Sequence, residues 1–210
     1  MEVKLISHTT DALNLLLRTK NTRLKFESPP EDWTDEQRSE HLAYMRDTIK
    51  SSWEFVDYTF EITGVTRAFT HQLVRTRHGS YAQESQRTVD VSGADVTMPE
   101  GLPGYGQELW RKAVDQMMAT YACLLADGVA AQDARGILPT SINTSIIAKF
   151  NLRTLHEMAK LRLCTRTQGE YQEVFRSMRE LVTGVHPWTA EFIEVHCVAT
   201  GTCAFPRYGK

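Results

Sequence analysis

The chain has 210 residues, of which 41% are apolar and 24% are charged, and its formal net charge is −2. This length and apolar content suit a globular protein with a real core, and the negative charge argues against a surface devoted to nucleic acid. No apolar stretch approaches the roughly 20 residues of a membrane helix, so we expect a cytoplasmic protein without a membrane or nucleic-acid partner.

The N-terminal part of the chain predicts short strands and helices. Residues 3–7 predict a short strand, and residues 28–31 (Ser-Pro-Pro-Glu) break the chain. Thr34 predicts a helix N-terminus, because two acidic residues and a glutamine follow it. Residues 56–63 alternate apolar and polar side chains, which is typical of a half-buried strand, and we expect Gly64 to end it.

The rest of the chain predicts mostly helices. Glycines and prolines indicate that residues 88–106 are mainly loop. We expect helices over residues 65–74, over residues 109–125, from the break at residues 138–141 to about residue 163, and over residues 170–182. The sequence therefore predicts a helix-rich α+β fold with a small sheet. We expect a single domain over residues 1–210, because no strong boundary interrupts the chain.

The four cysteines are too sparse for a disulfide scaffold, and their number fits a reducing compartment. They are Cys123, Cys164, Cys197 and Cys203. Cys197 and Cys203 lie near His196, which raises the alternative of a zinc site. A structural zinc site needs four ligands at recognisable spacing, and the chain offers no CxxC pair. We therefore expect no metal site.

A cluster of basic side chains lies within residues 75–87. Its members are Arg75, Arg77, His78 and Arg87. Guanidinium groups pair bidentately with phosphate, and the glycine and serines between them let backbone N–H groups approach an anion. If residues 83–87 are extended, Gln83, Ser85 and Arg87 point to one side and form a row for a nucleotide. The alternative is a solvated basic loop.

A second pattern places Asn151 and Arg162 on one face of the expected helix. They are eleven positions apart, which is three helical turns plus about 20°. Leu155 and Met158 lie between them on that face, so Arg162 is expected at the edge of an apolar surface. An arginine there needs an anionic ligand or a carboxylate of the chain itself.

The basic cluster resembles the signature of the flavin-dependent thymidylate synthases, which has the form RHRxxSxxxxSxR, often with Asn-Glu or Ser-Gln before the second serine. The matching positions are Arg75, Arg77, Ser80, Gln83, Ser85 and Arg87. The likeness continues in residues 62–68, in the Ala-Arg-x-x-Leu-Pro turn at 134–139, in the Asn-x-Arg and Leu-Arg pairs of residues 151–162, and in residues 164–170. It covers most of residues 50–175.

The resemblance implies an enzyme that methylates C5 of a uridine monophosphate, either UMP or dUMP. It implies FAD as the flavin, NADPH as the reductant and methylene-tetrahydrofolate as the carbon donor. It also implies a homotetramer in which several subunits build each active site. In this family no enzyme cysteine needs to attack the pyrimidine, and the basic cluster holds none.

The resemblance also assigns roles to individual residues. Those expected to contact the flavin are Ser51, Arg75, Thr76, Arg77, His78, Gln83, Asn151, Arg153 and Glu157. Those expected around the nucleotide are Gln72, Arg75, Gln83, Glu84, Ser85, Gln86, Arg87, Thr88, Arg135 and Arg162. We expect Arg162 to be the catalytic residue, because a cation facing the uracil stabilises negative charge that develops at N3–C4. Ser85 has no evident His–Asp pair to activate it, so we assign it to binding.

The chain departs from the family pattern at three places. Thr76 stands where the signature has histidine, and residues 48–55 lack both histidines of the family's Gly-His-x-Ser-x-x-Glu-His run, which affects the expected folate pocket. Thr88 replaces the tyrosine that usually follows the last signature arginine. We expect the smaller Thr88 to make room for a ribose 2′-OH and to hydrogen-bond it.

A ribose-accepting enzyme would be similar to the flavin-dependent UMP C5-methylase of nucleoside-antibiotic (polyoxin-type) biosynthesis. The alternatives are a housekeeping dUMP-to-dTMP synthase and a uridylate hydroxymethylase with a remodelled folate site. A nucleotide- or RNA-binding module without activity is a further alternative, although only one aromatic residue interrupts the basic cluster.

Overall fold

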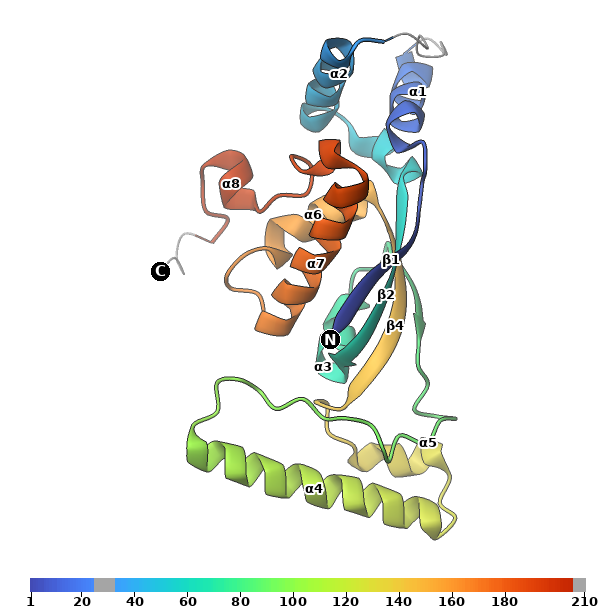
Figure 1. Cartoon of the computed structure of the whole chain (residues 1–210), viewed down its shortest axis with the longest axis vertical. Helices are drawn as coiled ribbons and strands as arrows, with labels where there is room; N and C mark the ends of the chain where they lie inside the picture. Colours follow the sequence, from blue (N-terminus) through green and yellow to red (C-terminus); the bar gives the residue numbers. More distant parts are fainter. Residues whose placement is uncertain (25–32, 206–210) are drawn as a thin grey trace. The chain divides into compact units, whose positions relative to one another are not determined.

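The computed structural model describes residues 1–24 and 33–205 (Figure 1). The predicted break at residues 28–31 lies outside the described residues. The described chain forms two compact units. The first unit comprises Met1–Glu2, Ile62–Arg75 and Tyr81–Ile147, and the second unit comprises the described residues of Val3–Glu61, Thr76–Ser80 and Ala148–Lys210.

Four strands form one sheet in the order β1-β2-β4-β3. Their bounds are Glu2–His8 for β1, Asp57–Thr66 for β2, Ser80–Gln83 for β3 and Asn143–Asn151 for β4. Strands β2 and β4 run antiparallel. Leu152 N donates to Val56 O at 2.8 Å beyond one end of the pair, and Arg67 N donates to Ile142 O at 3.0 Å beyond the other. The predicted strand at residues 3–7 is confirmed as β1.

Strand β2 confirms the alternating pattern of residues 56–63, since Tyr58, Phe60 and Ile62 are fully buried. The expectation that Gly64 ends the strand is wrong, because β2 continues to Thr66. Gly64 has a φ of 65°, a conformation that glycine adopts without a steric penalty, so the strand passes through it.

The expected helix between residue 141 and residue 163 is wrong in its first half. Residues 143–151 form β4, and only Leu152–Arg162 form helix α6. Alternate side chains of β4 are buried, namely Thr144, Ile146, Ala148 and Phe150. This period of two, with β-branched and aromatic residues on the buried face, favours a strand over a helix.

The second unit holds α6 and most of the other helices. They are α1 (Ala12–Leu24), α2 (Asp35–Asp47), the 3₁₀ turns η1 (Lys50–Phe55) and η3 (Pro187–Thr189), α7 (Gly169–Val185) and α8 (His196–Thr200). Thr34 caps α2 in a capping box with Gln37, as predicted. The helix expected over residues 170–182 is confirmed as α7, which lies beside α6 (Figure 1).

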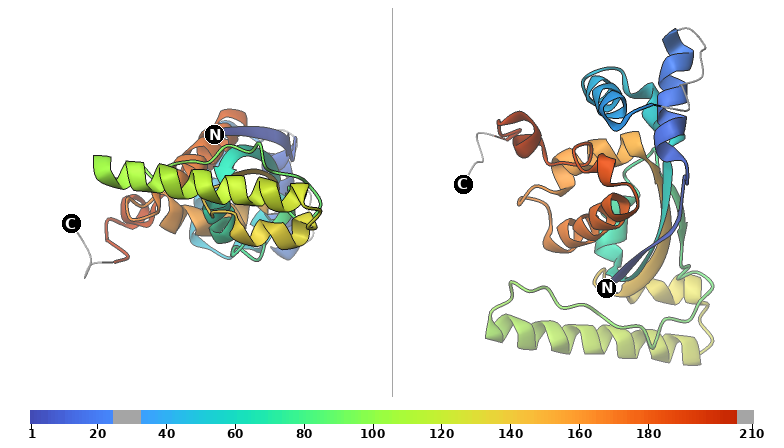
Figure 2. Two further views of the ribbon diagram at one scale, coloured as in Figure 1. Left: turned by 90° about the horizontal axis from the view of Figure 1, so that it is seen from below. Right: turned by 45° about the horizontal axis from the view of Figure 1, so that its top comes forward.

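The first unit contains α3 (Arg67–Leu73), α4 (Gly104–Ala126), α5 (Ala131–Ala134) and the 3₁₀ turn η2 (Arg135–Ile137). The predicted helices at residues 65–74 and 109–125 are confirmed as α3 and α4. Tyr121 of α4 is fully buried in a small core with Val91, Ala134 and Ile142. Figure 2 shows α4 along its whole length with α5 beside it.

These elements confirm a helix-rich α+β fold with a small sheet. That residues 1–210 make a single domain stays a prediction. None of the helices in the described residues combines the length and apolar character needed to cross a membrane.

We expect Gly64→Ala to lower the free energy of unfolding by about 1–3 kcal/mol, because an L-residue is strained at this positive φ. The added Cβ would also lie 3.1 Å from the backbone nitrogen of Met1. Urea denaturation measures the change. Gly93→Ala is the matched control, since its Cβ would meet nothing within 4 Å, and it should change stability by no more than about 0.5 kcal/mol. Equal stability of the two variants would contradict the explanation.

Candidate functional site

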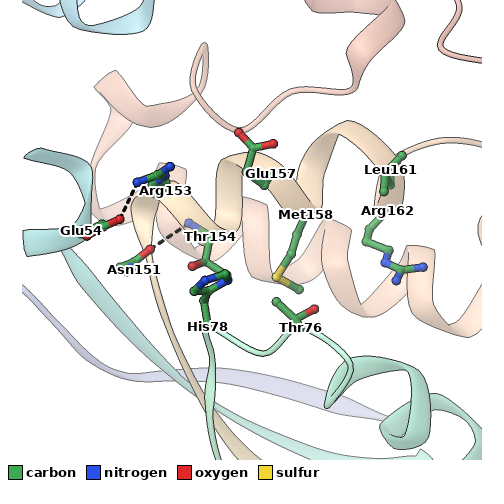
Figure 3. A pocket seen from close by; sticks show the side chains of 10 residues that line it. All are labelled: Glu54, Thr76, His78, Asn151, Arg153, Thr154, Glu157, Met158, Leu161 and Arg162. Carbon is green, nitrogen blue, oxygen red and sulfur yellow. Dashed lines mark hydrogen bonds and ion pairs between the residues drawn. The ribbon is translucent and has the colours of Figure 1, made fainter. Parts of the chain in front are cut away.

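A cavity of about 500 Å³ opens along α6 in the second unit (Figure 3). Its volume lies in the range of small-molecule and cofactor sites. Most of its wall comes from α6, with Thr76 and His78 from the segment before β3 and Glu54 from η1. The residues that line it are Glu54, Thr76, His78, Asn151, Arg153, Thr154, Glu157, Met158, Leu161 and Arg162.

The junction of β4 and α6 forms one end of the cavity. Asn151 is the last residue of β4 and the N-cap of α6, and its side-chain oxygen accepts a hydrogen bond of 2.8 Å from Thr154 N. The first turn of α6 therefore lines the cavity through Arg153 and Thr154 (Figure 3). The N-terminus of a helix carries a partial positive charge and free N–H groups, so this end suits a phosphate.

Two carboxylates in the cavity are ion-paired. Arg153 Nη1 lies 2.6 Å from Glu54 Oε1, and both side chains are about half exposed. Lys160 Nζ donates to Glu157 Oε1 at 2.8 Å. Burial raises the pKa of Glu157, but the hydrogen bond and charge of Lys160 and the charges of His156 and Lys50 together lower it by more, so the pKa lies below its ordinary value. Glu157 is therefore ionised at neutral pH.

Arg162 ends α6 and is held differently. Its guanidinium carbon lies 4.3 Å from the centre of the Tyr171 ring. In the part of the chain that the structure describes, Arg162 forms no ion pair. The sequence left two partners open for Arg162, namely a carboxylate of the chain and an anionic ligand. No carboxylate of the described residues pairs with it, so its positive charge is available to an anionic ligand.

The cavity brings together several residues that the resemblance assigns to the flavin. They are Thr76, His78, Asn151, Arg153 and Glu157. Ser51 lies in η1 and Arg77 beside Thr76, but neither is among the lining residues. Arg75 and Gln83 belong to the first unit. Their roles stay predictions.

Sequence reasoning missed some lining residues. Thr154 and Leu161 follow Asn151 at helical spacing, as the predicted Met158 does, so the period of α6 contained the signal. Glu54 keeps its place in the family's Gly-His-x-Ser-x-x-Glu-His run, and its pairing with Arg153 joins residues 99 positions apart. No local pattern indicates that contact.

The expected nucleotide residues, apart from Arg162, lie in the first unit. The expectation that Gln83, Ser85 and Arg87 form an extended row is wrong, because β3 ends at Gln83 and residues 86–88 form a turn. Arg87 N donates to Ser85 Oγ at 3.2 Å, and Val89 N donates to Ser85 O at 3.2 Å. Serine hydroxyls favour such turns by bonding backbone N–H groups two residues on.

The turn brings two expected nucleotide arginines to one partner. Arg87 Nε donates to the side-chain oxygen of Gln132 at 3.2 Å, and Arg135 Nε donates to its backbone oxygen at 3.1 Å. Two guanidinium groups held together suit a dianionic phosphate. Sequence reasoning missed Gln132, which has no charge and lies 45 positions from Arg87.

Arg67 is a further basic residue beside the expected nucleotide residues. Its Nη2 donates to Glu84 O at 2.7 Å. Burial lowers the pKa of Arg67, the charge of Glu84 raises it and the charge of Arg135 lowers it further, so the net pKa lies below its ordinary value. The charge of Arg135 thus disfavours the charged form of Arg67. Gln83 is held separately, since its amide donates to Thr70 Oγ1 at 2.8 Å.

The zinc alternative concerns the cysteines and His196. All four cysteines are free thiols. Within residues 1–24 and 33–205, no group of three or more His, Cys, Asp or Glu side chains is arranged to hold a metal ion.

The sequence matches the family model described as "Thymidylate synthase complementing protein" over residues 4–188. Several curated relatives are described as flavin-dependent thymidylate synthases. The one from Sulfurisphaera tokodaii is 33% identical over 208 residues, which cover 94% of this chain and 79% of the relative. The one from Geobacter sulfurreducens is 37% identical over 160 residues, which cover 73% of this chain and 68% of the relative.

Among solved structures, a similar one is the UMP/dUMP methylase PolB from Streptomyces cacaoi bound with 5-Br dUMP. The TM-score is 0.77, and the match covers 91% of this chain and 93% of PolB. At 21% sequence identity, this likeness supports the fold alone.

We expect Asn151→Ala to lower the free energy of unfolding by about 1 kcal/mol, because it removes the side-chain cap of α6. Asn151→Asp is the control, since aspartate also accepts the Thr154 N–H bond and favours a helix N-terminus. Urea denaturation without added ligand compares the two variants with the parent. If Asn151→Asp lost as much stability as Asn151→Ala, the cap would not be what stabilises the junction.

Proposed function

This chain belongs to the flavin-dependent thymidylate synthase family, and from that membership we propose how it carries out flavin-dependent C5 methylation of a uridine monophosphate. The chain is an enzyme, so the alternative of a binding module without activity falls away. The finer proposals concern the flavin site, the nucleotide site, the substrate and the co-substrates.

The flavin site is proposed to be the cavity along α6. The observation that carries this proposal is the convergence on this cavity of side chains far apart in the sequence, from Glu54 to Arg162. Bound FAD would carry the hydride and the one-carbon unit. Asn151 and the first turn of α6 would hold its diphosphate, and Arg153 would add a cation that its half-exposed pair with Glu54 can release.

The nucleotide phosphate is proposed to bind at the first-unit arginines. Arg87 and Arg135 share Gln132 as a partner, and Ser85 closes the turn beside them. Backbone and hydroxyl groups of this turn would add hydrogen bonds to the phosphate. Gln72, Glu84 and Gln86 remain proposed nucleotide contacts.

Arg162 is proposed to act on the pyrimidine. Arg162 has no carboxylate partner among the described residues, so its charge would stabilise negative charge that develops at N3–C4 of the uracil more strongly than an arginine already neutralised. None of the described residues that line the cavity is a cysteine. The task of the protein is then to position the reactants and to polarise the ring.

Methylene-tetrahydrofolate is the proposed carbon donor and NADPH the proposed reductant, both on the strength of the family. A homotetramer with active sites shared between subunits is proposed on the same ground. Ser51 and Glu54 keep their places in the family run, and Glu54 lines the cavity, whereas both family histidines are missing. The folate would therefore be held by other groups than in typical members.

UMP is proposed as a substrate beside dUMP. Thr88 is exposed in the turn that contains Arg87, at the position where the family has tyrosine. A threonine side chain leaves room for a 2′-OH and offers it a hydrogen-bond partner. The similar structure of a UMP/dUMP methylase shows that this fold accommodates such a substrate range in PolB.

We expect the purified protein to bind FAD and to form a C5-methylated product from UMP when NADPH and methylene-tetrahydrofolate are supplied. Mass spectrometry of separate UMP and dUMP reactions gives the product of each. A methyl gain on dUMP alone would identify a housekeeping enzyme, and the gain of a hydroxymethyl group would identify a hydroxymethylase. A protein that binds no flavin and methylates neither nucleotide would overturn the proposal.

The variant Thr88→Tyr is the matched control for the UMP proposal. We expect it to lower kcat/KM for UMP by about tenfold or more while leaving the value for dUMP within about threefold, because the added ring fills the space of the 2′-OH. Equal losses for both nucleotides would show that Thr88 does not set the preference.

A further inference from the structure

Tyr171 lies directly against the arginine that the proposed function places at the pyrimidine. It belongs to α7, its side chain is fully buried, and its ring centre is 4.3 Å from the guanidinium carbon of Arg162. Because α6 and α7 lie side by side, the contact joins the C-terminal end of one helix to the first turns of the other (Figure 1).

An aromatic ring holds a cation without neutralising it. A carboxylate would pair with Arg162 and cancel much of the field that reaches a ligand, whereas the face of a ring attracts a guanidinium and leaves its net charge intact. The other arginine of this cavity wall differs, since Arg153 forms an ion pair with Glu54. The difference singles out Arg162.

The hydroxyl of Tyr171 keeps the ring neutral. Burial raises the pKa of this hydroxyl, and the charge of Arg162 lowers it by less, so the net pKa lies above its ordinary value. The hydroxyl therefore keeps its proton at neutral pH, and Tyr171 adds no negative charge beside Arg162.

We propose that Tyr171 is a positioning residue for the methylation reaction. Its ring keeps the guanidinium of Arg162 directed at the reaction site, where no carboxylate of the described residues forms an ion pair with it. The inference rests on the proposed function of Arg162.

The test changes the electron density of the ring and not its shape. Phenylalanine and its mono-, di- and trifluorinated analogues are introduced at position 171, and kcat and KM for the uridylate are measured for each. Tyr171→Phe keeps the ring, so we expect a loss in kcat of no more than about fivefold from the missing hydroxyl. Successive fluorination weakens the attraction for a cation, and we expect kcat to fall stepwise to about 10²-fold below the parent.

The accompanying readouts separate positioning from folding. KM for the nucleotide and the rate of flavin reduction by NADPH should change by less than about threefold, because an interaction made mainly in the transition state appears in kcat. The same analogues at Tyr121, a fully buried tyrosine of the first unit, are the matched control and should leave kcat unchanged. Adding Arg162→Ala should abolish the dependence on fluorination.

The outcomes are distinct. A kcat that does not depend on ring fluorination, in a protein that methylates uridylate, would overturn the role of Tyr171 and leave the proposed function standing. A dependence that persists in the Arg162→Ala background would also overturn it, because Tyr171 would then act on something else. If the parent protein methylates no uridylate, the proposed function and this inference fall together.

Discussion

The change from strand to helix at Asn151 is the constraint on which the candidate site depends. Asn151 caps α6 through Thr154 N, and the next residue, Leu152, donates its N–H to Val56 O beside β2. These two bonds fix where α6 begins and anchor it to the sheet. Arg162 then follows at the other end of α6, about 16 Å along the helix axis. One helix thereby sets the spacing between an end suited to phosphate and a cation suited to the pyrimidine.

The charges along α6 form two classes with different consequences. The pairs of Arg153 with Glu54 and of Lys160 with Glu157 are partly exposed, and such pairs contribute about 0–1 kcal/mol, so a bound ligand can replace a partner at little cost. Arg162 is held by a neutral ring instead. In the proposed function, its charge would need no rearrangement before it acts, which is the condition for electrostatic stabilisation of a transition state.

Much of the fold follows from local patterns. The cap at Thr34, the alternation of β2 and the helical period of α7 depend on neighbouring residues, and the structure confirms them. The prediction of a helix in place of β4 was wrong, because serine and threonine before an apolar run also resemble a helix cap. A short apolar run alone does not distinguish a strand from a helix. The passage of β2 through Gly64 depends on a positive φ that the sequence permits but does not require.

The site was predictable in its residue types and less so in its contacts. The signature identified arginines for an anion, and the helical period placed Asn151 and Arg162 on one cavity. Gln132 and Tyr171 were missed, because each acts only through a tertiary contact with a distant arginine. The turn at Ser85 was also missed. The sequence assigns the Ser85 hydroxyl to ligand binding, whereas in the structure it accepts a hydrogen bond from the backbone N–H of Arg87.

A crystal structure of the FAD-loaded protein tests most directly whether the cavity along α6 is the flavin site. We expect the diphosphate of FAD at the first turn of α6, in contact with Asn151 and Arg153, and the flavin near Thr76 or His78. We also expect the guanidinium of Arg162 to remain on the Tyr171 ring. FAD bound elsewhere on the chain, with none of the α6 residues in contact, would contradict the assignment.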